Sequence, residues 1–207
     1  MQQLAPAETA LLAAVDVSPM LGQVQQWCAV NTGTGNLAGL AQQTALLADA
    51  FAALPGSVTL EEPAPVSAMG ADGIERPIAN GQHLVLRVRP GAQRRFLLTR
   101  HMDTVYPAGH AFQQQTWLDQ DTLNGPGVAD MKGGIAVILA ALKAFETSAA
   151  AAATGYDVMI NSDEETGSLA SAPLIARLAQ GKAAALTYEP SALPDGTLAG
   201  ARAGSGA

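Results

Sequence analysis

Three features of the 207-residue sequence predict an α/β fold. Strand-like and helix-like segments alternate through its second half, which is typical of parallel strands joined by helices. The apolar residues are mostly Ala, Leu and Val, and aromatic residues make up only 4%, which suits Ala-rich helices packed on a sheet. Hydrophobic residues reach 48% and charged residues 14%, so the chain is expected to bury a core.

The first half of the chain is expected to hold two helices followed by three strands. The glycine-rich turn NTGTGN separates the helices, Pro55-Gly56 ends the second, and 63–81 is expected to be an irregular surface segment. Strand 83–89 alternates apolar and polar residues, as a half-buried strand should. The predicted segments are helices at 20–30 and 37–54 and strands at 57–61, 83–89 and 95–99.

The second half is expected to alternate helices and strands after a long loop at 106–127. An Ala tract at 148–154 is read as a helix end or a loop. The predicted segments are helices at 132–146 and 169–179 and strands at 156–160 and 183–188.

Charge and cysteine content exclude several classes of function. The net charge of −7 provides no basic stripe for phosphate backbones, so nucleic acid is not an expected partner. Cys28 is the only cysteine, which excludes an intrachain disulfide and a cysteine zinc cluster. Residues 1–15 lack the basic start of a signal peptide, and the longest apolar run, 134–142, is shorter than the about 20 residues that span a bilayer. A soluble cytoplasmic protein without membrane contact is therefore expected.

Candidate metal ligands recur at one kind of place, directly after a predicted strand or at the turn that opens the helix at 132–146. Ligands of open α/β sheets bind beyond the carboxyl ends of the strands, so these side chains are expected to meet at one edge. The candidates are His101, Asp103, Asp130, Glu164, Glu165 and Glu189.

The concentration of carboxylates at that edge predicts a metal site. Without compensation the carboxylates would repel one another, and Arg100, Lys132 and Arg177 are expected to be too scattered to neutralise them. Carboxylate oxygen and imidazole nitrogen are ordinary zinc ligands. Asp103, two residues after His101, faces the same side of an extended segment and can accept the other imidazole N–H.

Two simpler interpretations compete with the metal site. The turn that contains Asp130 also resembles a phosphate-binding loop, but it lacks the spacing and the Ser/Thr of a P-loop. The pair Glu164-Glu165 is also compatible with solvated carboxylates at a helix start. The order of all the segments, each at a strand end, favours the metal site.

Four segments resemble, in order, the motifs of the dizinc peptidase family that contains glutamate carboxypeptidase, acetylornithine deacetylase, succinyl-diaminopimelate desuccinylase and aminoacylase. The glutamate carboxypeptidase branch is similar also in NTGTGN. The resemblance implies a zinc-peptidase-like catalytic domain, with a mostly parallel mixed sheet covered by helices on both faces. The matching segments are HMDTVYP, GPGVADMKGG, SDEETGS and YEPS.

By position, the resemblance implies four metal ligands. His101 and Glu189 would bind the first zinc, Glu165 the second, and Asp130 would bridge both. Cobalt or manganese are possible substitutes. The resemblance also implies a cis peptide bond between Asp130 and Met131.

The resemblance further implies two residues that act in hydrolysis. Glu164 would be the general base that takes a proton from the attacking water, and Asp103 would orient His101. The implied reaction is metal-assisted cleavage of an amide bond in an N-acyl amino acid or a peptide.

Length is the main departure from the family. The resemblance implies family members about twice as long as this chain, which is enough for two domains. In them a lid and dimerisation domain follows the fourth motif, and the chain then returns to the catalytic domain for a last histidine ligand. Residues 1–200 are therefore expected to be the N-terminal portion of a catalytic domain that is incomplete at its C-terminus. Residues 201–207 are expected to be the start of the lid segment, whose remainder is missing from this chain. His83, interpreted as structural, and His110, interpreted as exposed, do not match the last ligand. The alternative to an amide hydrolase is a metal-binding fragment without catalysis, because its second zinc site is incomplete.

Overall fold

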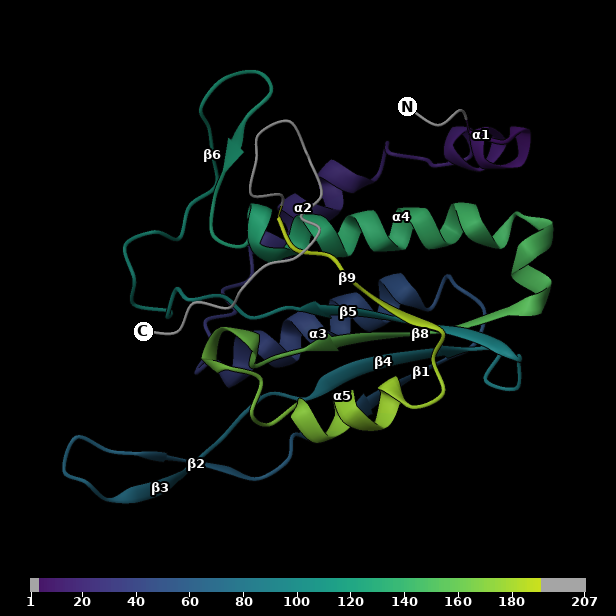
Figure 1. Ribbon diagram of the computed structural model, residues 1–207. Coiled ribbons are helices and arrows are strands. Elements are labelled where there is room, and N and C mark those ends of the chain that lie inside the picture. Colours follow the sequence, from purple (N-terminus) through teal and green to yellow (C-terminus); the bar gives the residue numbers. More distant parts are fainter. Residues whose placement is uncertain (1–3, 191–207) are drawn as a thin grey trace.

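A computed structural model describes residues 4–190 and shows a five-stranded sheet with several helices on one face and a single helix on the other (Figure 1). The helices are α1 (Pro6–Ala13), α2 (Met20–Cys28), α3 (Leu37–Phe51), α4 (Gly134–Glu146) and α5 (Ala172–Ala179). The sheet strands are β1 (Ser57–Glu61), β4 (His83–Val88), β5 (Arg94–His101), β8 (Thr154–Asn161) and β9 (Ala184–Thr187). Short helical turns are η1 (Val128–Gly133), η2 (Ala149–Ala153) and η3 (Glu164–Thr166), and two small hairpins are β2 (Val66–Met69) with β3 (Glu75–Ile78) and β6 (Thr116–Trp117) with β7 (Leu123–Asn124).

The sheet is mixed, in the order β1-β4-β8-β5-β9. β1 and β8 both pair with β4 in antiparallel fashion, whereas β8 and β9 flank β5 in parallel. Leu98 of β5 lies opposite both Val158 and Leu186. The carboxyl ends of β5, β8 and β9 therefore meet at one edge of the sheet, as the alternation of strands and helices predicts.

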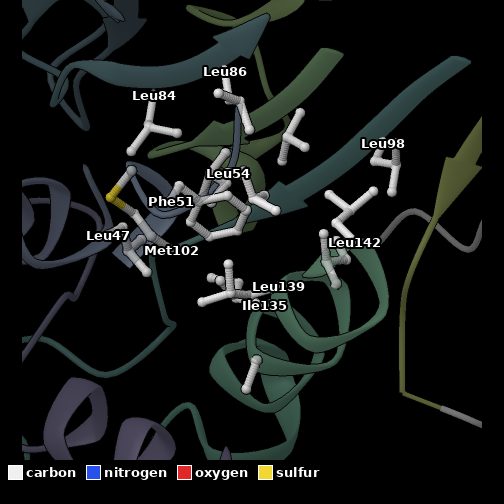
Figure 2. Close-up of a cluster of buried hydrophobic side chains, with 14 of the residues drawn as sticks. Leu47, Phe51, Leu54, Leu84, Leu86, Leu98, Met102, Ile135, Leu139 and Leu142 are labelled. Atoms are coloured by element: carbon white, nitrogen blue, oxygen red, sulfur yellow. The ribbon is translucent and has the colours of Figure 1, made fainter. Parts of the chain in front are cut away.

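The two faces of the sheet bury separate apolar clusters. On one face Leu84, Leu86 and Leu98 pack against α2, α3 and α4, and Figure 2 shows Phe51 of α3 and Ile135 of α4 in this cluster. On the other face, Val85 of β4 and the residues of β5 and β8 whose side chains point to that face pack against α5. This alternation of side chains between faces is the period of two of a strand buried on both sides. Figure 1 shows α5 on the side of the sheet opposite to α4.

The α/β fold with helices on both faces of a mixed sheet is confirmed, with corrections to single elements. The segment 63–81, expected to be irregular, contains the β2–β3 hairpin, which projects from the body in Figure 1. Strand β4, expected to be half-buried, is buried at every position except Arg87, because helices cover both faces of the sheet. The expected loop 106–127 contains the β6–β7 hairpin.

Boundaries around the expected helices also differ. The N-terminal helix α1 had no predicted counterpart. Helix α5 begins at Ala172, three residues after the predicted start, because residues 164–171 form a turn and loop. Between residues 4 and 190, none of the helices combines the length and the apolar character that crossing a bilayer requires. The expected boundary between residues 200 and 201 lies outside the described residues.

Candidate metal centre

The predicted ligands lie at the carboxyl edge formed by the three parallel strands. His101 is the last residue of β5, within the strand instead of after it, and Glu189 follows β9 by two residues. Glu164 and Glu165 form the turn η3 after β8. Asp130 lies in η1, where its backbone leaves the helical conformation (φ −118°, ψ 92°) just before α4. Its peptide bond to Met131 is cis, which confirms that prediction.

The imidazole of His101 is the centre around which the carboxylates gather. Its Nε2 lies 3.1 Å from Asp130 Oδ1 and 3.8 Å from Glu164 Oε2. Glu189 Oε2 is 4.0 Å from the same nitrogen. One ligand atom each from His101, Asp130 and Glu165 lie within 4.8 Å of one another. The structure thus brings all four predicted ligands to the same edge.

These distances fit a tetrahedral zinc ion. Two ligand atoms that are each about 2.1 Å from zinc lie about 3.4 Å apart in a tetrahedron. The observed separations of 3.1 and 4.0 Å from His101 Nε2 to Asp130 and Glu189 bracket that value. The donor set of one imidazole and several carboxylates is also one that zinc accepts. The residues present therefore fit the metal that the sequence predicts.

His101 is held so that its Nε2 faces the carboxylates. It is 1% exposed, and its Nδ1 lies 3.1 Å from the backbone oxygen of Asp103 and 3.4 Å from Asp103 Oδ1. A neutral imidazole that carries its proton on Nδ1 and donates it there would leave Nε2 free as an acceptor. This geometry is compatible with the orienting role predicted for Asp103.

The buried carboxylate of Asp103 also holds the turn that carries the two glutamates. Its Oδ1 accepts from the backbone N–H of Glu164 (3.2 Å) and its Oδ2 from that of Glu165 (3.1 Å). The hydroxyl of Thr34 donates to Oδ2 as well, at 2.8 Å. Sequence reasoning did not assign Thr34, although its turn NTGTGN was noted as similar to the family. The contact joins segments 69 residues apart, so local pattern could not show it.

Close approach of that turn to the segment after β5 requires glycine at one position. A Cβ atom on Gly33 would lie 2.5 Å from the backbone oxygen of Tyr106. The side chain of Asn31 donates to the same oxygen at 2.9 Å. The turn is thereby fixed against the loop behind Asp103, which places Thr34.

A second buried carboxylate closes the loop behind η3. Asp163 Oδ2 accepts from the backbone N–H groups of Ala170 (2.7 Å) and Ser171 (3.1 Å). Gly167, with φ of +94°, ends η3 in the left-handed region, where glycine avoids the steric cost of a Cβ. The side chains of Glu164 and Glu165 therefore project from a turn whose backbone is held at both ends.

The pKa values show how crowded with negative charge the site is. Burial lowers the pKa of His101, but the carboxylates of Asp103, Glu164 and Asp130 outweigh it and raise that pKa to about 9. Burial and the neighbouring carboxylates raise the pKa of Glu165 to about 7, against the opposing effect of His101. Burial likewise raises the pKa of Glu189. A divalent cation can replace the protons that the cluster otherwise holds.

The cations near the site differ from expectation in one case. Arg100, expected to be too scattered to neutralise a carboxylate, pairs with Glu189 at 2.9 Å. Its place next to His101 puts it at the same edge. Lys132 is buried and donates to the backbone oxygens of Trp27 (3.0 Å) and Val30 (2.9 Å). Arg177 pairs with Glu61.

The other two histidines lie outside the group of ligand atoms. His83 is buried at the start of β4, with Nδ1 3.4 Å from the Ser162 hydroxyl, and burial lowers its pKa. His110 is exposed, and its ring lies 5.1 Å from that of Tyr106. His101 is therefore the single histidine of the chain in the candidate centre.

Comparison with known proteins identifies the family of the chain. The sequence profile of peptidase family M20/M25/M40 matches residues 97–201, just over half of the chain, including every predicted ligand. The chain belongs to peptidase family M20/M25/M40. The family predicted from the motifs is thus confirmed.

Relatives of this M20 chain are longer than it. Carboxypeptidase G2 of Pseudomonas sp. (strain RS-16) is 30% identical over 187 residues, which are 90% of this chain and 42% of that protein. The fold is similar to human carnosine dipeptidase 1 (TM-score 0.66, 18% identity, 87% of this chain and 41% of that one). It is also similar to the di-peptidase Dug1p of Saccharomyces cerevisiae (TM-score 0.65, 14% identity, 87% and 40%). The M20 chain therefore spans about two fifths of the length of each.

Proposed function

We propose that this chain forms the N-terminal part of the catalytic domain of a zinc-dependent hydrolase, which cleaves an amide bond in an N-acyl amino acid or a peptide. Family membership supports hydrolysis. The carboxypeptidase and the dipeptidase among the similar proteins support an amide bond of a small peptide or an N-acyl amino acid as the bond that is cleaved. The proposed division is residues 1–200 for the catalytic portion and 201–207 for the start of a lid segment. The cytoplasmic location remains a prediction from the sequence.

The observation that carries the proposal is that one ligand atom each of His101, Asp130 and Glu165 lies within 4.8 Å of the others. A solvated acidic surface would not surround a 1% exposed imidazole with carboxylates at 3.1 to 4.0 Å. We assign His101 and Glu189 to one zinc, Glu165 to a second, and Asp130 to both. When bound, the two zinc ions would supply the Lewis acid that activates water and polarises the amide carbonyl.

The chain itself supplies the proton transfers and the positioning. Glu164 is the proposed general base: its carboxylate is half-exposed beside His101 Nε2, so it can take a proton from water and pass it to the leaving amine. Asp103 holds Glu164 and Glu165 through their backbone N–H groups and faces the Nδ1 side of His101. The proposed general base Glu164 and the proposed ligands Glu165 and His101 are therefore all positioned by Asp103.

A metal-binding fragment without useful catalysis is the second candidate. Among the described residues only Asp130 and Glu165 would hold a second zinc, because neither His83 nor His110 joins them. His101, Asp130 and Glu189 would hold the first zinc, with one position left for a water. We expect the 207-residue chain to bind about one zinc tightly.

Zinc content and hydrolysis of N-acyl amino acids, measured on the 207-residue chain and on a version extended past Ala207, test both candidates. The amide-hydrolase proposal expects turnover and two zinc ions in the extended protein. The fragment proposal expects one zinc and little turnover in the shorter chain. Absence of zinc binding by both proteins would refute the metal centre, and two tight zinc ions with robust turnover in the shorter chain would refute the fragment.

A further inference from the structure

Arg100 is an unusually placed cation. It is the penultimate residue of β5, directly before His101, and only 2% of it is exposed. Burial lowers its pKa to about 10, against the opposing effects of Glu189, Tyr188, Asp130 and Glu164. A buried charge is costly unless it is paired and hydrogen-bonded. The position therefore needs an explanation beyond packing.

The guanidinium of Arg100 uses only part of its hydrogen-bonding capacity. Nη1 donates to Glu189 Oε1 at 2.9 Å, and the guanidinium carbon lies 5.3 Å from the centre of the Tyr188 ring. Nε and Nη2 are buried and have no hydrogen-bond partner among residues 4–190. Both contacts thus go to the two residues that follow β9, and one of them is the candidate zinc ligand.

Glu189 divides its two oxygens between Arg100 and His101. Oε1 accepts the bond from Arg100, while Oε2 lies 4.0 Å from His101 Nε2. The Glu189 side chain is 37% exposed, and its carboxylate would otherwise be free to rotate towards solvent. With one oxygen held by the guanidinium, the other is directed towards the imidazole with which it would share an ion.

We propose that Arg100 is the positioning residue for Glu189, which it orients so that Oε2 alone is offered to the zinc ion bound by His101. This role rests on the proposed zinc centre. Partners that orient a metal ligand act through geometry, and their loss typically weakens metal binding about 10- to 100-fold. The occupant is a divalent cation, for which a directed carboxylate oxygen and an imidazole nitrogen are suitable ligands.

A role through charge alone predicts the opposite sign. A guanidinium close to the zinc position repels the ion, so removing that charge would tighten zinc binding if orientation did not matter. A merely structural pair predicts no change in affinity for a folded variant. The direction of the change therefore separates the three roles.

Zinc titration calorimetry on the 207-residue chain, after chelation of endogenous metal, tests the proposal. Arg100→Met is expected to weaken the tight site about 10- to 100-fold. Arg100→Lys, which retains one donor, is expected to lose less. Arg89→Met is the matched control, because Arg89 also pairs with a glutamate beside a tyrosine ring but has no contact with the site. Its zinc affinity should equal that of the unchanged chain, and thermal melting shows which variants are folded.

A Glu189→Gln background gives a second readout that a structural role would not move. Because Arg100 acts through the Glu189 carboxylate, adding Arg100→Lys or Arg100→Met to Glu189→Gln should weaken zinc binding much less than in the unchanged chain. If Arg100→Met does not fold, the Lys variant in the two backgrounds carries the test. Unchanged or tighter zinc binding by the folded Arg100 variants, or equal losses in both backgrounds, would overturn the proposal. If the unchanged chain binds no zinc, the proposed function itself fails.

Discussion

Two arginines at opposite ends of the sheet each pair with a glutamate, but their guanidinium groups differ in how many hydrogen bonds they make. Arg89, after β4, donates Nη1 and Nη2 to both oxygens of Glu146 and Nε to the backbone oxygen of Thr154 (2.7 Å). The hydroxyl of Tyr156 also donates to Glu146, at 2.8 Å. The guanidinium of Arg100, by contrast, makes one hydrogen bond within residues 4–190, to Glu189.

The number of hydrogen bonds in each pair matches the place of the pair in the fold. The Arg89 pair joins the end of β4 to the end of α4 and the start of β8, where each of the three guanidinium nitrogens donates a hydrogen bond that stabilises the fold. The Arg100 pair lies beside His101 at the carboxyl edge, where one carboxylate oxygen faces the imidazole instead of the arginine. An ion pair at a functional site can leave donors unused, because its carboxylate has a second partner. Four experiments separate the two ends of the sheet.

The largest contrast is expected from the glutamates at the carboxyl edge. In the extended protein, Glu164→Gln should lower turnover by about 10²- to 10⁴-fold, because the proposed general base is lost, while zinc content stays nearly unchanged. Glu165→Gln should instead lower zinc content, because a proposed ligand is lost. Elemental analysis beside an N-acyl amino acid assay distinguishes them. Equal loss of zinc in both variants would show that the base and the ligand are assigned wrongly.

The carboxyl edge should also make stability depend on pH in the chelated 207-residue chain. The pKa of His101 is raised from 6.5 to about 9, so its favourable contribution is full below pH 6.5 and is lost as pH rises through 9. The pKa of Glu165 is raised from 4.5 to about 7, so its contribution is likewise lost between pH 4.5 and 7. Melting temperature should therefore fall from pH 6 to pH 9.

Zinc should reverse that dependence, because its ligands bind without their protons. At a free zinc concentration of 100 times the dissociation constant, the gain is about 2.7 kcal/mol. Melting curves with chelator and with zinc, on the unchanged chain and on His101→Gln, measure both effects. A pH dependence equally steep in His101→Gln would assign it to other groups.

At the other end of the sheet, Arg89→Met should cost about 1.5–3 kcal/mol of unfolding free energy, because Glu146 loses a charged partner in a partly buried place. Urea unfolding of the zinc-free chain provides the measurement. A cost below about 0.5 kcal/mol, the usual range for a surface substitution, would contradict the structural role.

The smallest effect on stability is expected from Arg100→Met. Its removal takes away a buried, incompletely bonded charge, and Glu189 is exposed enough to be hydrated. Replacement of such a charge by an apolar side chain is often neutral or stabilising, so the change should stay within about 1 kcal/mol in the same urea experiment. A loss as large as that of Arg89→Met would mean that the two pairs serve the same purpose.

The sequence predicted that the candidate ligands meet at one edge of the sheet, because these residues stand at strand ends. His101, Glu165 and Glu189 each lie within five residues of the end of a predicted strand, and parallel strands bring such ends together. Strand β1 was predicted with its observed bounds because Pro55-Gly56 marks its start. Local pattern and topology were sufficient there.

The missed features depend on contacts that local pattern does not encode. The β2–β3 hairpin has short strands with largely exposed side chains, so it shows no apolar alternation. The pairing of Arg100 with Glu189 spans 89 residues and depends on β9 lying directly beside β5. Thr34 reaches Asp103 from a turn before α3. Such partners emerge only when the segments are placed in space.

Asp103 has a consequence for anyone who would move this centre onto another scaffold. Its carboxylate accepts hydrogen bonds from the backbone N–H groups of both Glu164 and Glu165, and its backbone oxygen lies next to His101 Nδ1. Grafting the visible ligands alone would transfer their chemistry without the spacing between them. The smallest portable unit is therefore the ligand set together with Asp103 and the Thr34 turn that supports it, and a design that omits these two would have to provide the same spacing anew.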